Sequence, residues 1–108
     1  MLMKTAQSTK PLPNLDEILV RLRTHFPELR ARYHIASLGV FGSYVRGEQH
    51  KKSDLDLLIE FDVTPTLFQL AALQRELTEC SGIKVDLTLR RTLKPGFGKY
   101  ILPEVIYL

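Results

Sequence analysis

The sequence predicts an α/β domain of the α+β kind, in which helices pack on a small mixed β-sheet. Apolar runs of strand length alternate along the chain with segments of helical periodicity, and turn-forming glycines and prolines separate them. The chain has 108 residues, 44% of them hydrophobic, which suffices for one core and excludes a second domain. We expect a flexible polar segment over residues 1–13, which holds two prolines, and a single domain over residues 14–108.

The first third of the chain predicts a helix followed by a strand. Asn14 with Glu17 three positions later is a capping arrangement, and apolar residues then recur at helical spacing. Pro27 predicts a kink or a break in this helix, with a second short helix from Pro27 through about Tyr33. A continuous apolar strand is expected over Ile35–Phe41.

The rest of the chain continues the alternation. Thr64 and Pro65 are expected as the N-cap and first position of a helix, and Gly82 as the residue that ends it. The expected elements are one or two helical turns over 44–48, a loop over 49–53, a strand over 55–61, a helix over 66–81, a strand over 83–89 and a short helix over 97–102. The last residues are too few to classify.

Composition excludes several classes of protein. The net charge of +3 is modest and the basic residues are scattered, so they form no stripe typical of a dedicated nucleic-acid binder. The single cysteine, Cys80, has no disulfide partner and lies in an apolar helical pattern, which indicates a core residue. His25, His34 and His50 lack metal-ligand spacing. No signal-peptide or membrane-spanning stretch is present, and we expect a cytoplasmic protein.

The most informative segment joins a Gly-Ser turn to paired carboxylates. Gly42-Ser43 directly follows an apolar strand, and a glycine there lets backbone N–H groups turn toward phosphate oxygens. Asp54 and Asp56 are expected on one face of the next strand, because side chains alternate along a strand. Asp86 comes from the polar face of a strand that can lie beside it. Such carboxylates repel one another unless a cation lies between them, and Mg²⁺ carrying a nucleotide's phosphates fits that place.

Three carboxylates can bind two Mg²⁺ ions, as in a two-metal site for displacement at phosphorus. Arg46 and the pair Lys51/Lys52 would add positive charge for the phosphates. Plainer interpretations exist: an Asp-x-Asp pair is common in solvated turns, Ser43 could be a helix N-cap, and Arg46 could form only a surface ion pair with Glu48. Glu60 or Asp62 could take the place of Asp86.

One motif of the chain resembles the signature of the DNA polymerase beta-like nucleotidyltransferase superfamily. It consists of Gly42-Ser43, ten intervening residues, Asp54-Leu55-Asp56 and a later Val85-Asp86-Leu87. Within it, the chain is similar to the minimal nucleotidyltransferases (MNT) of prokaryotes from about Ile35 through Asp86. The resemblance implies a catalytic, metal-binding set of Asp54, Asp56 and Asp86, and a nucleotide-binding set of Gly42, Ser43, Arg46 and Ser53.

The resemblance also implies a function. Small members of this kind are commonly the antitoxin of a toxin–antitoxin pair with a HEPN-type ribonuclease, so Mg²⁺-dependent transfer of AMP from ATP to a toxin tyrosine is expected. Two alternatives stay open: a binding module that neutralises its partner by contact alone, and a small-molecule transferase of the aminoglycoside-modifying kind. We expect the partner to dock on residues 44–52 and on the apolar tail, residues 97–108.

Overall fold

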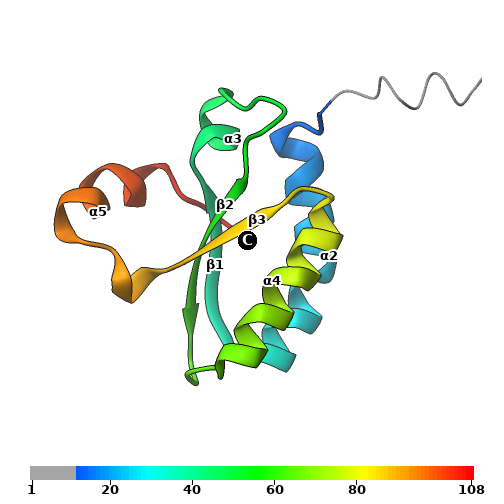
Figure 1. Ribbon diagram of the computed structural model, residues 1–108, viewed down its shortest axis with the longest axis vertical. Coiled ribbons are helices and arrows are strands. Elements are labelled where there is room, and N and C mark those ends of the chain that lie inside the picture. Colours follow the sequence, from blue (N-terminus) through cyan, green and yellow to red (C-terminus); the bar gives the residue numbers. More distant parts are fainter. Residues whose placement is uncertain (1–11) are drawn as a thin grey trace, which may run out of the picture.

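The computed structural model describes residues 12–108, in which two long helices cover one face of a four-stranded sheet (Figure 1). The elements are α2 (Leu15–Tyr33), β1 (Ile35–Phe41), α3 (Ser43–Arg46), β2 (Leu55–Phe61), α4 (Leu67–Ser81), β3 (Val85–Leu89), the 3-10 turn η1 (Arg90–Thr92), α5 (Pro95–Ile101), the 3-10 turn η2 (Leu102–Glu104) and β4 (Ile106–Tyr107). The predicted fold class is confirmed. Of the flexible segment expected over residues 1–13, residues 1–11 lie outside the described part.

The sheet is mixed and has the strand order β3-β2-β1-β4. β1 pairs antiparallel with β2 and with β4, whereas β2 and β3 run parallel. The parallel pair is joined by the long crossover helix α4, as a parallel connection requires. The strands over 35–41 and 55–61 agree with the prediction.

The sequence predicts a kink or a break at Pro27. Helix α2 runs unbroken through this residue, so a break with a second short helix is wrong. Proline removes one helical hydrogen bond and crowds the preceding turn, at a cost of about 3 kcal/mol. Leu22 and Leu29, on either side of Pro27, are only 1% and 2% exposed, so packing on both sides holds the helix together. The predicted cap is present: the Asn14 side chain accepts a hydrogen bond from the Glu17 N–H at 2.9 Å.

Helix α4 begins one residue later than predicted. Thr66, and not Thr64, is the N-cap, because its hydroxyl accepts from the Gln69 N–H at 3.1 Å while the Gln69 side chain accepts from the Thr66 N–H at 2.9 Å. This reciprocal capping box satisfies two N–H groups that would otherwise lack partners. Gly82 ends the helix in the left-handed conformation, with φ of +78°, as predicted.

Strand β3 begins at Val85 and not at Ile83. The Ser81 hydroxyl donates to the Ile83 carbonyl at 3.1 Å and accepts from the Ile83 N–H at 3.2 Å. These two bonds use both backbone groups of Ile83 and hold it in the turn, so the ladder to β2 starts two residues further on.

The core lies between the sheet and the two long helices. The strand residues that face the helices meet the apolar stripes of α2 and α4, while Phe41 and Leu58 are buried as well but lie outside this cluster. The best-buried members are Ile18, Leu22, Ile35, Leu38, Val40, Leu55, Leu57, Ile59, Leu73, Leu77 and Val85. Cys80 packs against this core, as predicted, and burial raises the pKa of its thiol.

A polar cluster joins α2 to α4 at the edge of this core. Glu76 on α4 accepts two hydrogen bonds from the Arg32 guanidinium, at 2.8 and 2.9 Å, and one from the Tyr33 hydroxyl. The Arg32 hydrogen bond is the main reason that the pKa of Glu76 is lowered. The cluster fixes the two helices relative to one another.

The C-terminal tail lies on the opposite side of the sheet from α2 and α4 (Figure 1). Its helix α5 starts at Pro95, two residues before the predicted start, and β4 adds a short edge strand that the sequence left unclassified. β4 approaches β1 closely because Gly39 has no side chain; a Cβ there would overlap the Val105 side chain. Part of the tail thus belongs to the sheet. Two of its apolar residues, Phe97 and Tyr100, remain 64% and 79% exposed.

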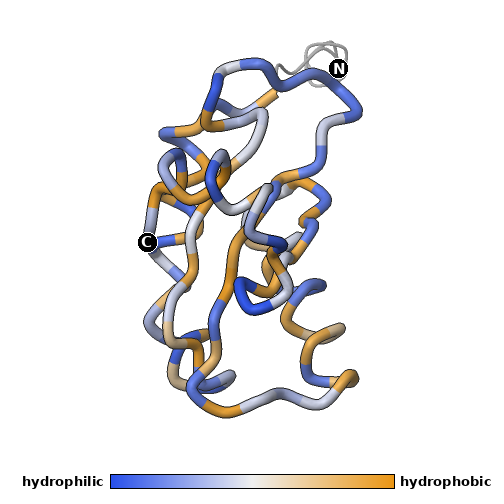
Figure 2. The backbone as a smooth tube through the Cα atoms, turned by 90° about the vertical axis from the view of Figure 1, so that its left-hand side faces the viewer, coloured by the Kyte–Doolittle hydropathy of each residue, from blue (hydrophilic) through white to orange (hydrophobic). Residues whose placement is uncertain are grey.

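No helix within residues 12–108 is long and apolar enough to cross a membrane. Figure 2 shows hydrophobic stretches along the strands, while hydrophilic positions dominate the loops at the top of the molecule.

Candidate active site

The parallel pairing of β2 and β3 brings two of the predicted acids together. Asp56 lies directly opposite Asp86 in the register, between the pairs Leu55–Val85 and Leu57–Leu87. Both residues alternate with core residues, so they occupy the sheet face opposite to α2 and α4. Asp54 immediately precedes β2, so its expected place within the strand is wrong by one residue.

The electrostatics agree with this grouping. The pKa of Asp56 is raised, first because burial disfavours its charged form and then because of the negative charges of Asp86 and Asp54. Arg46 opposes this shift. Asp86 itself is exposed and Asp54 is half-buried. Three carboxylates thus share one region with too little positive charge to balance them.

This donor set fits a hard cation in its chemistry. Carboxylate oxygens are the ligands that Mg²⁺ prefers, and a cation would relieve the repulsion that, after burial, contributes to the raised pKa of Asp56. Within residues 12–108, no three acidic, histidine or cysteine side chains converge closely enough to hold a metal ion as they stand. Binding would therefore require Asp54 and Asp86 to rotate toward Asp56, which their partial exposure permits.

Glu60 and Asp62 are not placed to substitute for Asp86. Glu60 lies four residues beyond Asp56 along β2, which is about 13 Å at the rise of a strand. Its carboxylate accepts from the Ser37 hydroxyl at 3.1 Å and pairs with Arg90 at 3.5 Å. Asp62 lies beyond the end of β2, in the turn toward α4.

The Gly-Ser turn is built against the acids. Gly42 has φ of +85°, a conformation that favours glycine, and a Cβ at this position would collide with the Asp56 carboxylate. Its carbonyl accepts from the N–H groups of Val45 and Arg46 at 3.1 and 3.2 Å, which opens the short helix α3. The turn can approach Asp56 only because residue 42 lacks a side chain.

Ser43 is the first residue of α3, and the N-cap position is occupied by Gly42, so Ser43 is not an N-cap. The Ser43 side chain is half-buried, and its hydroxyl makes no hydrogen bond to any residue in the range 12–108. Tyr44 is only 2% exposed and packs in the core. Of these two neighbours, Ser43 is the one available to a phosphate.

Two other predicted nucleotide contacts already have partners in the protein. Arg46 donates from Nε to Glu48 at 2.9 Å and from Nη1 to Glu104 at 3.1 Å, and the hydrogen bonds to these two carboxylates raise its pKa. Ser53 accepts from the His50 N–H at 2.9 Å and so closes the turn of the 50–53 loop. Arg46 retains further N–H donors for a ligand, whereas the observed contact of Ser53 is structural.

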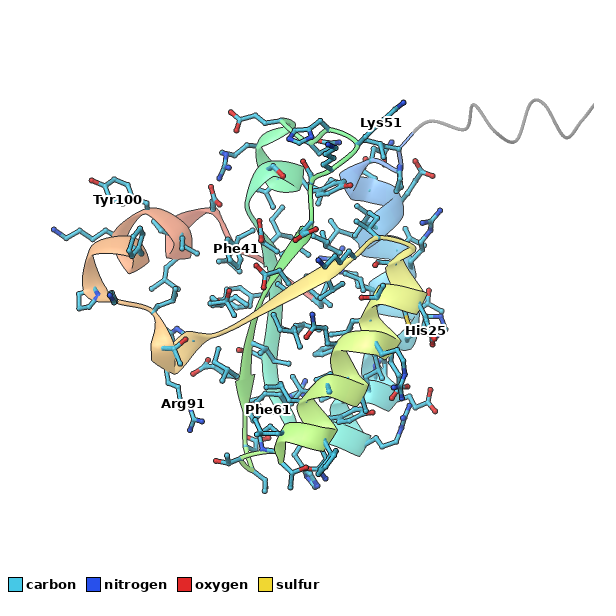
Figure 3. The ribbon with its side chains drawn as sticks, in the orientation of Figure 1. His25, Phe41, Lys51, Phe61, Arg91 and Tyr100 are labelled. Carbon is cyan, nitrogen blue, oxygen red and sulfur yellow. The ribbon has the colours of Figure 1, made fainter. Side chains whose placement is uncertain are left out.

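A cavity of about 360 Å³ adjoins Asp54, and neither Asp56 nor Asp86 lines it. Its lining includes Asp54 together with Lys51, Lys52 and Lys84. Figure 3 shows Lys51 at the top of the molecule, in the loop that follows α3. Three lysines beside Asp54 give this cavity a positively charged lining, which suits an anionic group.

A larger groove of about 840 Å³ lies at the other end of the sheet, between the start of α4 and α5. It contains none of the three acids. Leu67, Leu89 and Leu102 line it together with Arg91, Lys94 and Lys99. Figure 3 shows Arg91 pointing away from the sheet near this end.

Sequence reasoning missed Glu104. This residue lies in the tail, far from the motif, yet its carboxylate accepts a hydrogen bond from the Gly42 N–H at 2.8 Å and contacts Arg46. The only local signal is an acid in an otherwise apolar tail, and that signal does not indicate which residue it meets.

The chain is similar in sequence and in fold to known nucleotidyltransferases. The protein adenylyltransferase MntA of Thermococcus cleftensis is 43% identical over 94 residues, which are 87% of this chain and 95% of that protein. A solved structure assigned as a minimal nucleotidyltransferase superimposes with a TM-score of 0.75 at 35% identity and covers 89% of this chain and 97% of that one.

One chain in the solved complex of the tri-AMPylated Shewanella oneidensis HEPN toxin with MNT antitoxin has the same fold. Its TM-score is 0.59 at 15% identity, over 83% of this chain and 70% of that one. The family model described as the nucleotidyltransferase domain matches residues 22–108. With Gly42, Asp54, Asp56 and Asp86 arranged as above, the chain belongs to the nucleotidyltransferase domain family and is built like its minimal members.

Proposed function

We propose that this nucleotidyltransferase transfers AMP from Mg²⁺-bound ATP to a hydroxyl of a partner protein, and that the partner is a HEPN-type toxin which it neutralises as an antitoxin. The observation that carries the proposal is the juxtaposition of Asp56 and Asp86 across β2 and β3, with the Gly42 turn in contact with Asp56. The relative from T. cleftensis, 43% identical, is named a protein adenylyltransferase, which supports the adenylyl group and a protein acceptor.

In the proposed reaction, the acceptor hydroxyl oxygen forms a bond to the α-phosphorus of ATP. The bond from that phosphorus to the oxygen bridging the α- and β-phosphates breaks, and pyrophosphate leaves. The hydroxyl proton passes to one of the three carboxylates. When bound, two Mg²⁺ ions would lower the pKa of the attacking hydroxyl and neutralise the leaving pyrophosphate.

The protein's own residues supply position and charge. Asp54, Asp56 and Asp86 would hold the ions on the open face of the sheet. The Gly42 turn and the Ser43 hydroxyl would hold phosphate oxygens, since a turn without a side chain lets a ligand approach the backbone. Lys51, Lys52 and Lys84 add positive charge around the adjoining cavity.

The acceptor has to be brought by another molecule. A domain of 108 residues that uses its strands to hold metal ions and a triphosphate has little concave surface left for a second substrate. Donor and acceptor must nevertheless be held in line within near-attack distance. The HEPN toxin of the S. oneidensis complex is AMPylated and bound to its MNT antitoxin, which supports a protein acceptor of this kind.

The first experiment separates enzymatic transfer from neutralisation by contact. The double variant Asp54→Asn/Asp56→Asn is expected to abolish incorporation of α-labelled AMP into the HEPN-type partner while the chain stays folded. The same variant is expected to lose protection of cells that express the partner. Full protection by a variant that transfers no AMP would show that contact alone neutralises the partner, and the enzymatic account would fail.

A second experiment tests where the partner docks. Lys51 and Lys52 are exposed, so reversing both charges to Glu should cost little stability. If an acidic surface of the partner is steered by them, its association rate falls and loses salt dependence. Reversal of Arg75, an exposed charge on α4, is the matched control. Equal association rates for both variants and the wild type would remove this surface from the proposal.

A further inference from the structure

The ladder between β1 and β4 stops just short of the Gly-Ser turn. Gly39 pairs with Tyr107 and Val40 with Ile106, so continuing this antiparallel register places Gly42 opposite Glu104. The chain has left the sheet at that point, because residues Leu102–Glu104 form the 3-10 turn η2. The Gly42 N–H therefore has no backbone carbonyl opposite it.

The Glu104 side chain takes the place of that carbonyl. Its Oε2 accepts from the Gly42 N–H at 2.8 Å, and the Glu104 side chain is only 22% exposed. A hydrogen bond from a backbone N–H to a carboxylate is stronger than one to a neutral acceptor. The first residue of the turn is thus tied to the C-terminal segment.

The same carboxylate holds the arginine of α3. Arg46 Nη1 lies 3.2 Å from Glu104 Oε1 and 3.1 Å from Oε2. Glu104 therefore contacts both ends of the segment from Gly42 to Arg46, and two candidate nucleotide contacts depend on one side chain. Glu48 binds Arg46 as well, but has no contact with Gly42.

We propose that Glu104 is a positioning residue for nucleotide binding: it acts through Gly42 and Arg46 and holds the phosphate-binding turn in its binding geometry before ATP arrives. This inference rests on the proposed function. The turn needs such support because Gly42 adopts a positive φ and is packed against Asp56. A glycine that is free to sample other conformations would lose that geometry and the direction of the Ser43 backbone.

The competing interpretation is that Glu104 occupies the phosphate position and must be displaced by ATP. The direction of the Gly42 N–H argues against it. Backbone groups of alternate strand residues point to opposite neighbours, and Leu38 and Gly42 both bond toward the tail, to Leu108 and Glu104. The acids come from β2 and β3, on the other side of β1. Glu104 is close enough to contribute to the raised pKa of Asp56, but it is the last of the causes.

The test compares three variants of the full chain by calorimetric titration with MgATP. Glu104→Ala removes both contacts and is expected to weaken the affinity about tenfold, the loss expected for one charge-assisted hydrogen bond. Glu104→Gln keeps an acceptor for the Gly42 N–H and is expected to restore most of the affinity. Glu48→Ala removes only an Arg46 contact and is the matched control, with an expected change below about twofold.

A second readout follows the Gly42 amide proton without nucleotide. In Glu104→Ala its hydrogen exchange should become faster, whereas Glu48→Ala should leave it unchanged. A residue that served stability alone would lower Tm and leave the affinity for MgATP as it is.

The results separate this inference from the proposed function. Wild-type protein that fails to bind MgATP would refute the proposed function itself. If the wild type binds, equal or tighter binding by Glu104→Ala overturns the positioning role, and tighter binding would indicate that the carboxylate competes with phosphate. If Glu104→Ala does not fold, the affinity of Glu104→Gln for MgATP is compared with that of Glu48→Ala. Equal affinities support the contact with the Gly42 N–H. An affinity of Glu104→Gln that is tenfold weaker overturns the inference.

Discussion

Replacement of Asp56 by Asn should stabilise the ligand-free protein. Asp56 and Asp86 face each other on neighbouring strands, so their charges lie about 6 Å apart. Two like charges at that distance repel by about 0.7 kcal/mol in water and about 3 kcal/mol at an effective dielectric constant of 20. Because Asp86 is exposed, the lower part of this range applies, and we expect a gain of about 1 kcal/mol. For a domain of this size, that is a rise in Tm of about 4–8 °C.

The gain depends on pH in a definite direction. Because the pKa of Asp56 is raised by folding, the unfolded chain releases this proton at lower pH than the folded protein. Stability of the wild type therefore falls as pH rises from about 4 through the raised pKa. The advantage of Asp56→Asn should be absent below about pH 3 and complete above the raised pKa.

Thermal denaturation with Mg²⁺ and with EDTA is the assay. Mg²⁺ should raise the Tm of the wild type, because a cation relieves the same repulsion, and should do so much less for Asp56→Asn. Asp62→Asn, which removes an exposed acid beyond the end of β2, is the control and should not gain stability. An Asp56→Asn variant with unchanged or lower Tm at pH 7, together with a wild type that ignores Mg²⁺, would refute the reasoning.

Two further substitutions test the structure around the site. Gly42→Ala should destabilise the protein by about 2–3 kcal/mol and abolish binding of MgATP, because it adds a steric collision to an unfavourable φ. The control is Gly47→Ala: this residue has a positive φ of +71° but open space around it, so the substitution should cost only about 1 kcal/mol and retain binding. Urea denaturation measures the stability of both variants, and calorimetry measures their binding. Glu76→Gln should cost about 1–2 kcal/mol at pH 7 because the bidentate arginine loses its charged partner. Since the pKa of Glu76 is lowered by folding, the stability difference between wild type and Glu76→Gln should vanish as pH falls below the pKa of Glu76 in the folded protein. A stability difference that persists at pH 2 would contradict the role given to the Glu76 charge. Glu79→Gln, at an exposed position, is the control.

The parts of the fold that the sequence predicted well are those set by local pattern. The strands over 35–41 and 55–61 and the end of α4 at Gly82 follow from alternation and turn residues, which act within a few positions. The wrong boundaries have longer-range causes. Pro27 stays within α2 because of packing on both sides, and Ile83 is kept out of β3 by the Ser81 hydroxyl.

The site shows the same division. Strand alternation places Asp56 and Asp86 on the polar faces of two strands that can be neighbours, whereas the parallel register of β2 and β3 and the close approach of Gly42 to Asp56 are seen in the structure. The contact of Glu104 with Gly42 depends on the register between β1 and a two-residue edge strand more than sixty positions along the chain. No periodicity in the sequence encodes that pairing, so the residue could be found only in the structure.

The measurement that tests the central claim most directly is paired labelling of the HEPN-type partner with ATP. The partner and this chain are incubated with Mg²⁺ and with ATP that carries the label on either the α- or the γ-phosphate, and the partner is then analysed by mass spectrometry and for label. The account predicts that α-label appears on a tyrosine of the partner with the mass of AMP, that γ-label is released as pyrophosphate, and that Asp54→Asn/Asp56→Asn transfers neither. Transfer of γ-label, or a partner that is neutralised without acquiring α-label, would contradict it.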